Sequence, residues 1–452
     1  MSRSCRKKRT EASPRAAGRR IPGFLAALVL AGGWLSGGTA EPPGGVAVKS
    51  TTESGLTWIF RKDASSALTC VILLVKGGTG ADPAGKAGLS YLTTRNAIDI
   101  PDEGKVRDIM VQSTRLTVSG LEDATLISIQ CLSENLEEAL RTATRILKDP
   151  LISGFRIDII KENMRHQGKA EFDDSIRAGR AEAKKAFFGP AGYGGPVWGT
   201  EETLKAIRKK DVVDFYKGRF TASNMILSVS SDLEEADIRP LVAKYFAGFP
   251  AGSPLEDAQA PPKVPAERRV VIPKDAKQTY LGLHFPLPPI NAKVYAMACL
   301  AEDMLGGGVG SVLWPLRSRE RLAYTVDAFL SYARGGGVLS AYLETSPEKL
   351  GQARPSLERI VRDLGAGTIT EEDLRIARLS AGAAFLRTNE IKEIRTRTVL
   401  LFEARGLGCD YAERFPAELA AVGLDEMNAF LRETLSMDRA VEVVIGPVSQ
   451  GK

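Results

Sequence analysis

Residues with the types and spacing needed for metal, acyl-transfer or phosphate chemistry are few in this chain of 452 residues. Only two histidines occur, His166 and His284, and they are too far apart in sequence to form a ligand-like pair or to indicate a catalytic triad. The sequence contains no G-x-S-x-G to present a nucleophilic serine and no C-x-x-C to hold a metal. The glycine run Gly306–Gly308 is not followed by the G-K-[ST] of a phosphate loop, which argues against nucleotide binding.

A glycine-rich segment in the first hundred residues is followed by three polar residues at helical spacing. Residues 77–89 read G-G-T-G-A-D-P-A-G-K-A-G-L, and Tyr91, Thr94 and Arg95 follow. Residues three and four positions apart lie on one face of a helix. Zinc is bound by imidazole, thiolate or carboxylate, so a phenol, a hydroxyl and a guanidinium make a poor set of ligands.

This segment resembles the one that opens the metal helix of the pitrilysin/insulinase family of zinc peptidases, the inverzincins, where the next residues read H-x-x-E-H. The resemblance implies that the two ligand positions fall on Tyr91 and Arg95, and the general base on Thr94. A guanidinium repels a zinc ion, and a threonine hydroxyl does not take the proton of a metal-bound water. A third family ligand, a glutamate farther along the chain, would fall near Glu162 or Glu171, and neither makes a site alone. We therefore predict no zinc in this chain.

A second segment of the sequence also resembles a pattern of this family. Residues 304–313 read M-L-G-G-G-V-G-S-V-L, and residues 316–326 read L-R-S-R-E-R-L-A-Y-T-V. Together they resemble L-G-G-G-x-x-S-R-L followed by L-R-x-x-x-x-L-x-Y. The resemblance implies that Arg317 and Tyr324 reach across to a zinc site in another half of the enzyme, and that Gly306, Gly307 and Gly308 bind substrate. A guanidinium and a phenol both donate hydrogen bonds, which suits a developing oxyanion.

The same segment also has a plainer interpretation. Val312 stands where the family usually has an arginine, which alters a local contact more than the chemistry. Arg317, Arg319 and Arg321 could also be no more than the solvated face of a helix.

The chain repeats itself weakly at a long interval, which predicts two homologous halves. Residues 59–63 and 271–275 each carry a lysine-aspartate pair and lead into an apolar strand. Apolar strands are also expected at 225–229 and 440–445, in matching places near the end of each half.

We divide the chain accordingly into four parts. Residues 1–40 are a signal peptide, and residues 46–250 form an N-terminal domain with the degenerate metal motif. Residues 251–268 are a Pro-rich linker, and residues 269–447 form a C-terminal domain with the Arg317/Tyr324 pair.

Strands come first in each half and long helices follow. Apolar residues between Leu136 and Leu147 recur at the spacing of one helical face. Because strands and helices do not alternate strictly, we expect an α+β fold in which each domain packs helices against a mostly antiparallel sheet. The family resemblance implies the same architecture, half of a clamshell, over about residues 46 to 447.

The first forty residues have the features of a bacterial export signal. Eight Lys and Arg stand against one Glu there, a net charge of +7, and an apolar run follows from Phe24 to Leu35. That run is shorter than the roughly twenty residues that span a bilayer, so cleavage near Ala40 and a periplasmic location are expected. An uncleaved anchor stays possible, and Arg19-Arg20 loosely resembles a twin-arginine signal.

The formal charge of +6 comes from this leader, because the remaining residues sum to −1. The composition therefore gives no support to nucleic-acid binding. The thiols of Cys70 and Cys131 lie in apolar strand-like runs and are expected to be buried, although export would permit a disulfide.

Two functions from different classes remain. The first is a zinc-less subunit that supplies Arg317 and Tyr324 to a zinc-bearing insulinase-type partner of similar length, the two enclosing a peptide that adds as a strand to a sheet edge. The second is a non-catalytic clamshell protein that binds peptides or serves a structural role. An autonomous metallopeptidase is disfavoured by Tyr91, Thr94 and Arg95.

Overall fold

The computed structural model describes residues 45–99, 114–255 and 260–447, so the expected signal peptide lies outside the described residues. The described residues belong to one compact unit. The strands of its first half are β1 Val48–Thr51, β2 Thr57–Lys62, β3 Leu68–Lys76, β4 Arg115–Gly120, β5 Ala124–Leu132 and β6 Met225–Ser231. The helices of the first half are α1 Leu89–Ala97, α3 Leu136–Lys148, α4 Gly154–Asp173, α5 Ser175–Phe188, α6 Glu201–Ala206, α7 Lys209–Arg219 and α8 Glu235–Phe246.

The second half follows a similar order of elements, although its described residues contain no counterpart of β1 or α8. Its strands are β7 Arg269–Pro273, β8 Thr279–Leu287, β9 Thr325–Ala333, β10 Gly336–Thr345 and β11 Val441–Gly446. Its helices are α9 Ala292–Gly306, α10 Trp314–Ser318, α11 Leu350–Gly365, α12 Glu371–Thr388, α13 Lys392–Ala404, α14 Tyr411–Ala421 and α15 Leu424–Thr434.

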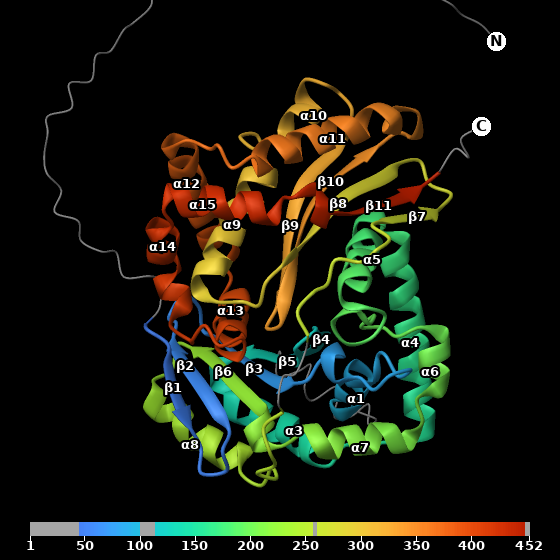
Figure 1. Cartoon of the computed structure of the whole chain (residues 1–452). Coiled ribbons are helices and arrows are strands. Elements are labelled where there is room, and N and C mark those ends of the chain that lie inside the picture. The colour runs from blue at the N-terminus through green and yellow to red at the C-terminus, as the bar shows by residue number, and fades with distance from the viewer. Residues whose placement is uncertain (1–44, 100–113, 256–259, 448–452) are drawn as a thin grey trace, which may run out of the picture. The chain divides into compact units, whose positions relative to one another are not determined.

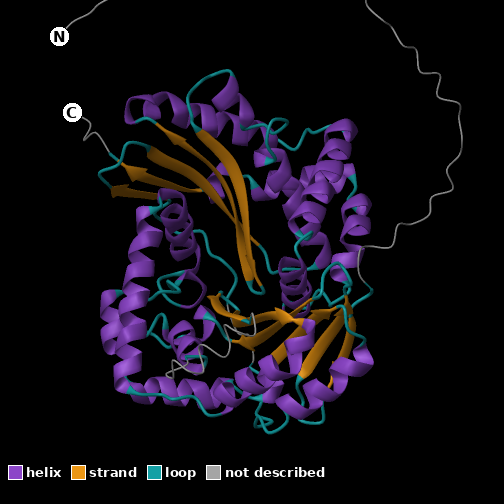
Figure 2. Cartoon of the chain, turned by 180° about the vertical axis from the view of Figure 1, so that it is seen from behind, coloured by secondary structure: helices purple, strands orange, loops and turns teal. Residues whose placement is uncertain are grey.

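Apart from the additional edge strand β1 of the first sheet, the two sheets have the same topology, which confirms the prediction of two homologous halves. The first sheet has the order β1-β2-β6-β3-β5-β4, and the second has the order β7-β11-β8-β10-β9. In each, one pair of strands is parallel, β2 with β6 and β7 with β11, and the other pairs are antiparallel. Figure 2 shows both sheets with helices around them. The α+β fold class predicted from the sequence is therefore confirmed.

The two halves exchange a helix. The central strand β3 is buried on both faces: one face packs against α3 and α8, and the other, with Ile72 and Leu74, packs against Val399 and Leu400 of α13 from the second half. Reciprocally, α5 of the first half packs against β8, β10 and β11 (Figure 1). Because each sheet is covered by a helix from the other half, the apolar runs of β3 and β8 have no exposed face.

A buried ionic contact fixes one side of this exchange. Asp63, which follows β2, is 1% exposed and accepts hydrogen bonds from the Arg395 guanidinium on α13. Lys392, at the start of α13, donates to the carbonyl oxygens of Asp63, Ser66 and Leu68, each at 2.8 Å. Burial opposes ionisation of Asp63, but the hydrogen bonds from Ser65 and Arg395 outweigh it and lower the pKa of this carboxyl.

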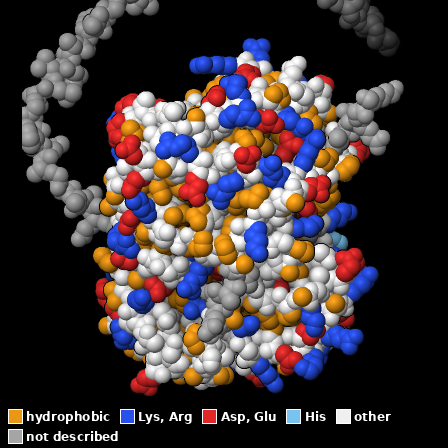
Figure 3. Space-filling model, in the orientation of Figure 1, with side chains coloured by type: hydrophobic (Ala, Val, Ile, Leu, Met, Phe, Trp, Pro, Cys, Tyr) orange, Lys and Arg blue, Asp and Glu red, His pale blue; other side chains and the backbone are white. Residues whose placement is uncertain are grey.

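No helix among the described residues is long and apolar enough to cross a membrane. On the face shown in Figure 3, basic and acidic side chains are interspersed. The segment between β6 and β7 contains α8 and then, in its described residues, neither helix nor strand before Arg269.

Candidate functional site

The turn that precedes α1 is built to hold the start of this helix. The Asp82 carboxylate accepts hydrogen bonds from the backbone N–H groups of Gly88 and Ser90, both at 2.7 Å. Gly88 has φ +92, and a Cβ there would lie 2.9 Å from the backbone nitrogen of Gly199, so this position requires glycine. This turn therefore fixes where α1 begins.

The side chain at the first ligand position is packed against an aromatic ring. The Tyr91 ring centre lies 4.7 Å from that of Trp198 in an edge-to-face arrangement, and burial raises the pKa of the phenol. Trp198 Nε1 in turn donates to Glu171 Oε2 at 2.5 Å. Thus Glu171, one of the two candidates for the third ligand, is held by an indole, while the other candidate, Glu162, pairs with Arg165 and His166 on the surface of α4.

The side chains at the other two motif positions, Thr94 and Arg95, also have a hydrogen-bond or ion-pair partner. Thr94 is fully buried, and its hydroxyl lies 2.7 Å from that of Thr125 on β5. Arg95 is partly exposed and lies 3.7 Å from Asp99, which also pairs with Arg156. Phenol, hydroxyl and guanidinium do not fit zinc, and the described residues contain no cluster of three His, Cys, Asp or Glu suited to a metal ion. The arrangement around α1 is that of a mostly buried helix packed into the first half.

The structure places Arg317 and Tyr324 on either side of a tight turn. Arg317 is exposed on α10, with its guanidinium carbon 5.2 Å from the centre of the Trp314 ring. Tyr324 precedes β9, is 66% exposed, and its backbone N–H donates to Glu344. Between them Arg321 has φ +53, a left-handed conformation that is unfavourable for a residue with a side chain, and Lys349 Nζ holds its carbonyl at 2.9 Å.

Tyr324 lines a groove of about 830 Å³ to which both halves contribute. The groove is bordered by Asp173, Asp174 and Ser175 at the junction of α4 and α5, by Glu344 near the end of β10, and by Ser346 just after it. Asp174 also caps α5 by accepting hydrogen bonds from the backbone N–H groups of residues 176 and 177. Arg317 does not line this groove, so the structure does not join the two residues in one cavity.

The glycines after α9 serve close packing. A Cβ on Gly306 would lie 2.0 Å from the backbone nitrogen of Ala328, and Gly308 has φ +91. The loop then folds back, and Val312 N–H donates to the Met304 carbonyl at 2.9 Å. Glycine is thus required here by the approach of β9, whether or not a substrate also binds.

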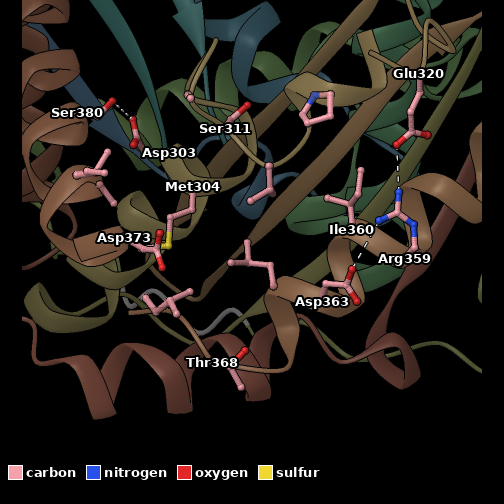
Figure 4. A pocket seen from close by; sticks show the side chains of 18 residues that line it. Asp303, Met304, Ser311, Glu320, Arg359, Ile360, Asp363, Thr368, Asp373 and Ser380 are labelled. Carbon is pink, nitrogen blue, oxygen red and sulfur yellow. Dashed lines mark hydrogen bonds and ion pairs between the residues drawn. The ribbon is translucent and has the colours of Figure 1, made fainter. Parts of the chain in front are cut away.

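Two cavities flank the C-terminal part of α9, and both were missed by sequence reasoning. The first, of about 640 Å³, lies among α9, α11 and α12; there Arg359 pairs with Glu320 and Asp363, and Ser380 donates to Asp303 (Figure 4). The second, of about 550 Å³, lies among α9, β9, α12 and α13. Gly307 lines both cavities, and Gly306 lines the second.

The remaining titratable residues singled out in the sequence are structural. His284 is fully buried between Ser340, at 2.8 Å from Nδ1, and Tyr280, at 3.3 Å from Nε2, and burial lowers its pKa to about 3. His166 is exposed on α4. Cys70 and Cys131 are buried and free, and burial raises the pKa of both thiols, to about 11 and about 12.

Comparison with known sequences finds relatives across much of the chain. Residues 206–380 match the family profile described as the Peptidase M16 inactive domain. The chain is 25% identical over 281 residues to an uncharacterized zinc protease of Mycobacterium leprae, covering 59% of this chain and 61% of that protein. It is 21% identical over 357 residues to the non-peptidase homolog YmxG of Helicobacter pylori, covering 78% of each. The first of these alignments thus spans about three fifths of the relative's length.

Solved structures share the fold over nearly their whole length. The peptidase M16 inactive domain from Pseudomonas fluorescens superposes with a TM-score of 0.81 at 19% identity, covering 90% of this chain and 99% of that one. A protease from Helicobacter pylori gives a TM-score of 0.80 at 15% identity, covering 89% and 99%. A chain of complex III2 from Candida albicans gives 0.76 at 14% identity, covering 89% and 96%. At these identities the likeness establishes the fold.

Proposed function

We propose that the chain is the zinc-less subunit of a two-chain peptidase, a proposal supported by its match to the Peptidase M16 inactive domain over residues 206–380 and by its similarity to a non-peptidase homolog. A zinc-bearing partner of similar length supplies the metal and the general base. This chain supplies donors to the substrate and to the oxyanion of the tetrahedral intermediate. The expected leader places the pair in the periplasm.

The exposure of Tyr324 carries the proposal. A tyrosine that only packs buries its ring, whereas Tyr324 is 66% exposed beside a groove that both halves form. Arg317 is exposed on α10 and is separated from Tyr324 by the strained turn at Arg321. Strain of this kind is kept where the surroundings over-determine it, often at functional sites. Two donors displayed on the surface suit a site that a second chain completes.

The β4 edge of the first sheet is a better candidate for binding an extended peptide than the β9 edge of the second sheet. Both β4 and β9 are edge strands, each next to one neighbour. In β9 the backbone N–H groups of Ala328 and Leu330 are already bonded, at 2.8 Å, to the carboxylates of Asp327 and Glu302. A peptide adding there would have to displace both carboxylates, so β4 is the edge on which we expect strand addition.

Reconstitution tests this proposal. The mature chain and a zinc-bearing H-x-x-E-H chain encoded in the same genome are purified separately, and cleavage of an unstructured fluorogenic peptide is followed for each alone and for the mixture. We expect cleavage only in the mixture, removed by a chelator and restored by zinc. Chelator-sensitive cleavage by this chain alone would refute the subunit role.

Failure of the two chains to associate would also refute it. If this chain then still bound the peptide by itself, the non-catalytic peptide-binding function would replace the subunit role. Association is measured by sedimentation, so that an inactive complex is distinguished from no complex.

A further inference from the structure

The cavity of about 550 Å³ among α9, β9, α12 and α13 combines features of a ligand site that the proposed peptidase role does not use. We call it the acidic cavity, lined by Glu302, Asp303, Asp327, Asn389 and several aromatic residues. Its volume lies within the range of small-molecule sites, about 300–1,000 Å³.

Its three carboxylates are partly buried with little compensation. Each accepts one hydrogen bond that the structure records: Glu302 Oε1 from Leu330 N–H at 2.8 Å, Asp327 Oδ1 from the adjacent backbone N–H at 2.8 Å, and Asp303 Oδ1 from Ser380 Oγ at 2.7 Å. None of the three forms an ion pair within 4.0 Å with any residue in the described ranges. Burial raises the pKa of all three carboxyls, that of Glu302 to about 7.

An unpartnered acceptor also lines the cavity. The Asn389 side chain is only 9% exposed, and its Nδ2 donates to the Phe385 carbonyl at 2.9 Å, which fixes the orientation of the amide. Its Oδ1 has no hydrogen-bond partner among the described residues. Buried acceptors are rarely left unpaired, so this atom points to a missing donor.

The cavity wall is aromatic. Tyr295, Phe385 and Phe402 line it, with the Tyr295 and Phe402 rings 5.5 Å apart and the Phe385 and Phe402 rings 6.5 Å apart. Aromatic faces attract cations, most strongly where water is excluded. Carboxylates, an amide oxygen and aromatic rings are all complementary to positive charge carried on a hydrogen-bond donor.

We propose that the acidic cavity binds an organic cation, the guanidinium or ammonium end of a slender aliphatic chain. Its nitrogen donors satisfy Asn389 Oδ1 and the carboxylates of Glu302 and Asp327, and its methylene groups lie against the rings. A bare metal ion is not the ligand, because the described side chains here do not converge as a metal cluster.

In the described part of the chain, the arginine side chains near the cavity do not form ion pairs with its three carboxylates. Arg405 lines the cavity, but its Nε lies 3.5 Å from Asp123, outside the group of three carboxylates. Arg180 of α5 stacks its guanidinium carbon 3.5 Å from the centre of the Phe329 ring. Arg180 attracts Glu302 and Asp327, and Arg387 attracts Asp303, yet the pKa of each carboxyl remains raised.

Calorimetric titration of the purified mature chain tests the site with two probes. One is n-butylguanidine, and the other is a blocked pentapeptide with a single arginine between alanines, compared with the same peptide carrying citrulline. We expect at least one arginine-type probe to bind saturably and the citrulline peptide to bind at least tenfold more weakly. Binding of n-butylguanidine identifies a free small cation as sufficient, whereas binding of the arginine peptide alone identifies a peptide side chain as the source. Absence of saturable binding by both probes, or equal binding of the citrulline peptide, would overturn the proposal.

Isosteric variants locate the site. Glu302→Gln and Asp327→Asn each keep an acceptor for the backbone N–H and remove the charge, and each should weaken binding at least tenfold. Asp363→Asn is the matched control, since Asp363 lines only the neighbouring cavity (Figure 4). Circular dichroism confirms that each variant is folded, and two independent variants are used so that misfolding of one leaves the test standing. Unchanged affinity in a folded Glu302→Gln or Asp327→Asn variant, or equal loss in Asp363→Asn, would refute this location.

The pH dependence gives a readout that a structural role would not show. Guanidinium stays charged between pH 6 and 8, whereas the Glu302 carboxyl, with a pKa of about 7, takes up a proton as the pH falls. Affinity should therefore fall about tenfold from pH 8 to pH 6. The Glu302→Gln variant should lose this dependence, because the pKa values of Cys299 and Tyr295, which also line the cavity, are raised well above this window. A wild-type affinity that does not change with pH would contradict the role given to Glu302.

Discussion

Thr94 occupies the position to which the family resemblance assigns the general base, and its packing explains why substitutions at the motif positions alone would not restore metal chemistry. The side chain is fully buried, and its hydroxyl is paired with that of Thr125. A carboxylate placed there would be desolvated without a cation to balance its charge.

We therefore expect the wild-type chain to hold far less than one zinc after mild dialysis. The triple change Tyr91→His, Thr94→Glu, Arg95→His should give no peptidase activity, because Glu171 stays bound to Trp198 and the surrounding hydrogen bonds are wrong. It should also lose about 1–3 kcal/mol of stability through the buried glutamate. Elemental analysis and urea unfolding measure both effects, with Arg95→His alone as the control at a partly exposed position. About one zinc per wild-type chain would contradict the assignment.

Arg317 and Tyr324 make the second prediction at this scale, in the complex with a zinc-bearing partner. Arg317→Ala and Tyr324→Phe should each lower kcat by roughly a hundred- to a thousand-fold, as removal of an oxyanion donor does. Assembly, measured by sedimentation, should be little changed. Arg319→Ala is the matched control, an exposed arginine of the same segment that fits neither donor position. Equal losses in all three variants would mean that the segment serves folding or the interface.

The sequence could indicate α1 and the Arg317/Tyr324 segment because their information is local, in spacing and glycine context. It could not indicate the acidic cavity. Glu302 and Asp303 stand at the end of an apolar helix and read as solvated charges, and only the packing of α9 on β9 brings them to Asp327.

At the scale of elements, local sequence patterns predicted individual strands and helices but not how these pack between the two halves. The strands at 225–229 and 440–445 and the helical face from Leu136 to Leu147 are present as β6, β11 and α3. The exchange of α5 and α13 between halves was not foreseen, because an amphipathic pattern shows that a face is buried and not which sheet covers it.

The contact of Asp63 with α13 should be a main determinant of stability in this exchange. Asp63→Asn leaves Arg395 and Lys392 buried without their counter-charge, so it should cost about 3–5 kcal/mol of unfolding free energy at pH 7. Because folding lowers the pKa of Asp63, this contribution is present at neutral pH and is lost as the pH falls through the pKa values of the folded and unfolded forms. Urea unfolding measures the effect.

Lys49→Ala is the control for Asp63→Asn. Lys49 lies 2.9 Å from Glu403 of the same helix α13, but its side chain is 49% exposed, so its loss should cost less than about 1 kcal/mol. A cost for Asp63→Asn no larger than that of Lys49→Ala would show that the buried pair only offsets its own desolvation.

At the scale of the whole molecule, the two halves share one topology but differ in the residues that surround their edge strands β4 and β9. In the first half, the edge strand β4 lies beside α1, which carries Tyr91, Thr94 and Arg95. In the second half, the Asp327 and Glu302 carboxylates accept hydrogen bonds from backbone N–H groups of the edge strand β9, and both residues line the acidic cavity. The two halves thus share one fold, and the side chains on α1 and α9 make the surroundings of their edge strands different.

The helix exchange predicts that neither half folds alone. Residues 45–255, produced without the second half, would expose Ile72 and Leu74 on the face that α13 covers, and burial of each such side chain contributes about 1.5–3 kcal/mol. Residues 260–447 would likewise expose Tyr280 and Tyr342, which α5 covers. We expect each fragment to aggregate or to lack a cooperative thermal transition, and the two produced together to form a 1:1 complex with native circular dichroism. The full chain cut by an engineered protease site at 256–259 is the control, since its halves fold before they are separated. A fragment that is monomeric and unfolds cooperatively near the melting temperature of the intact chain would show that each half folds independently. The exchanged helices would then not be required for folding.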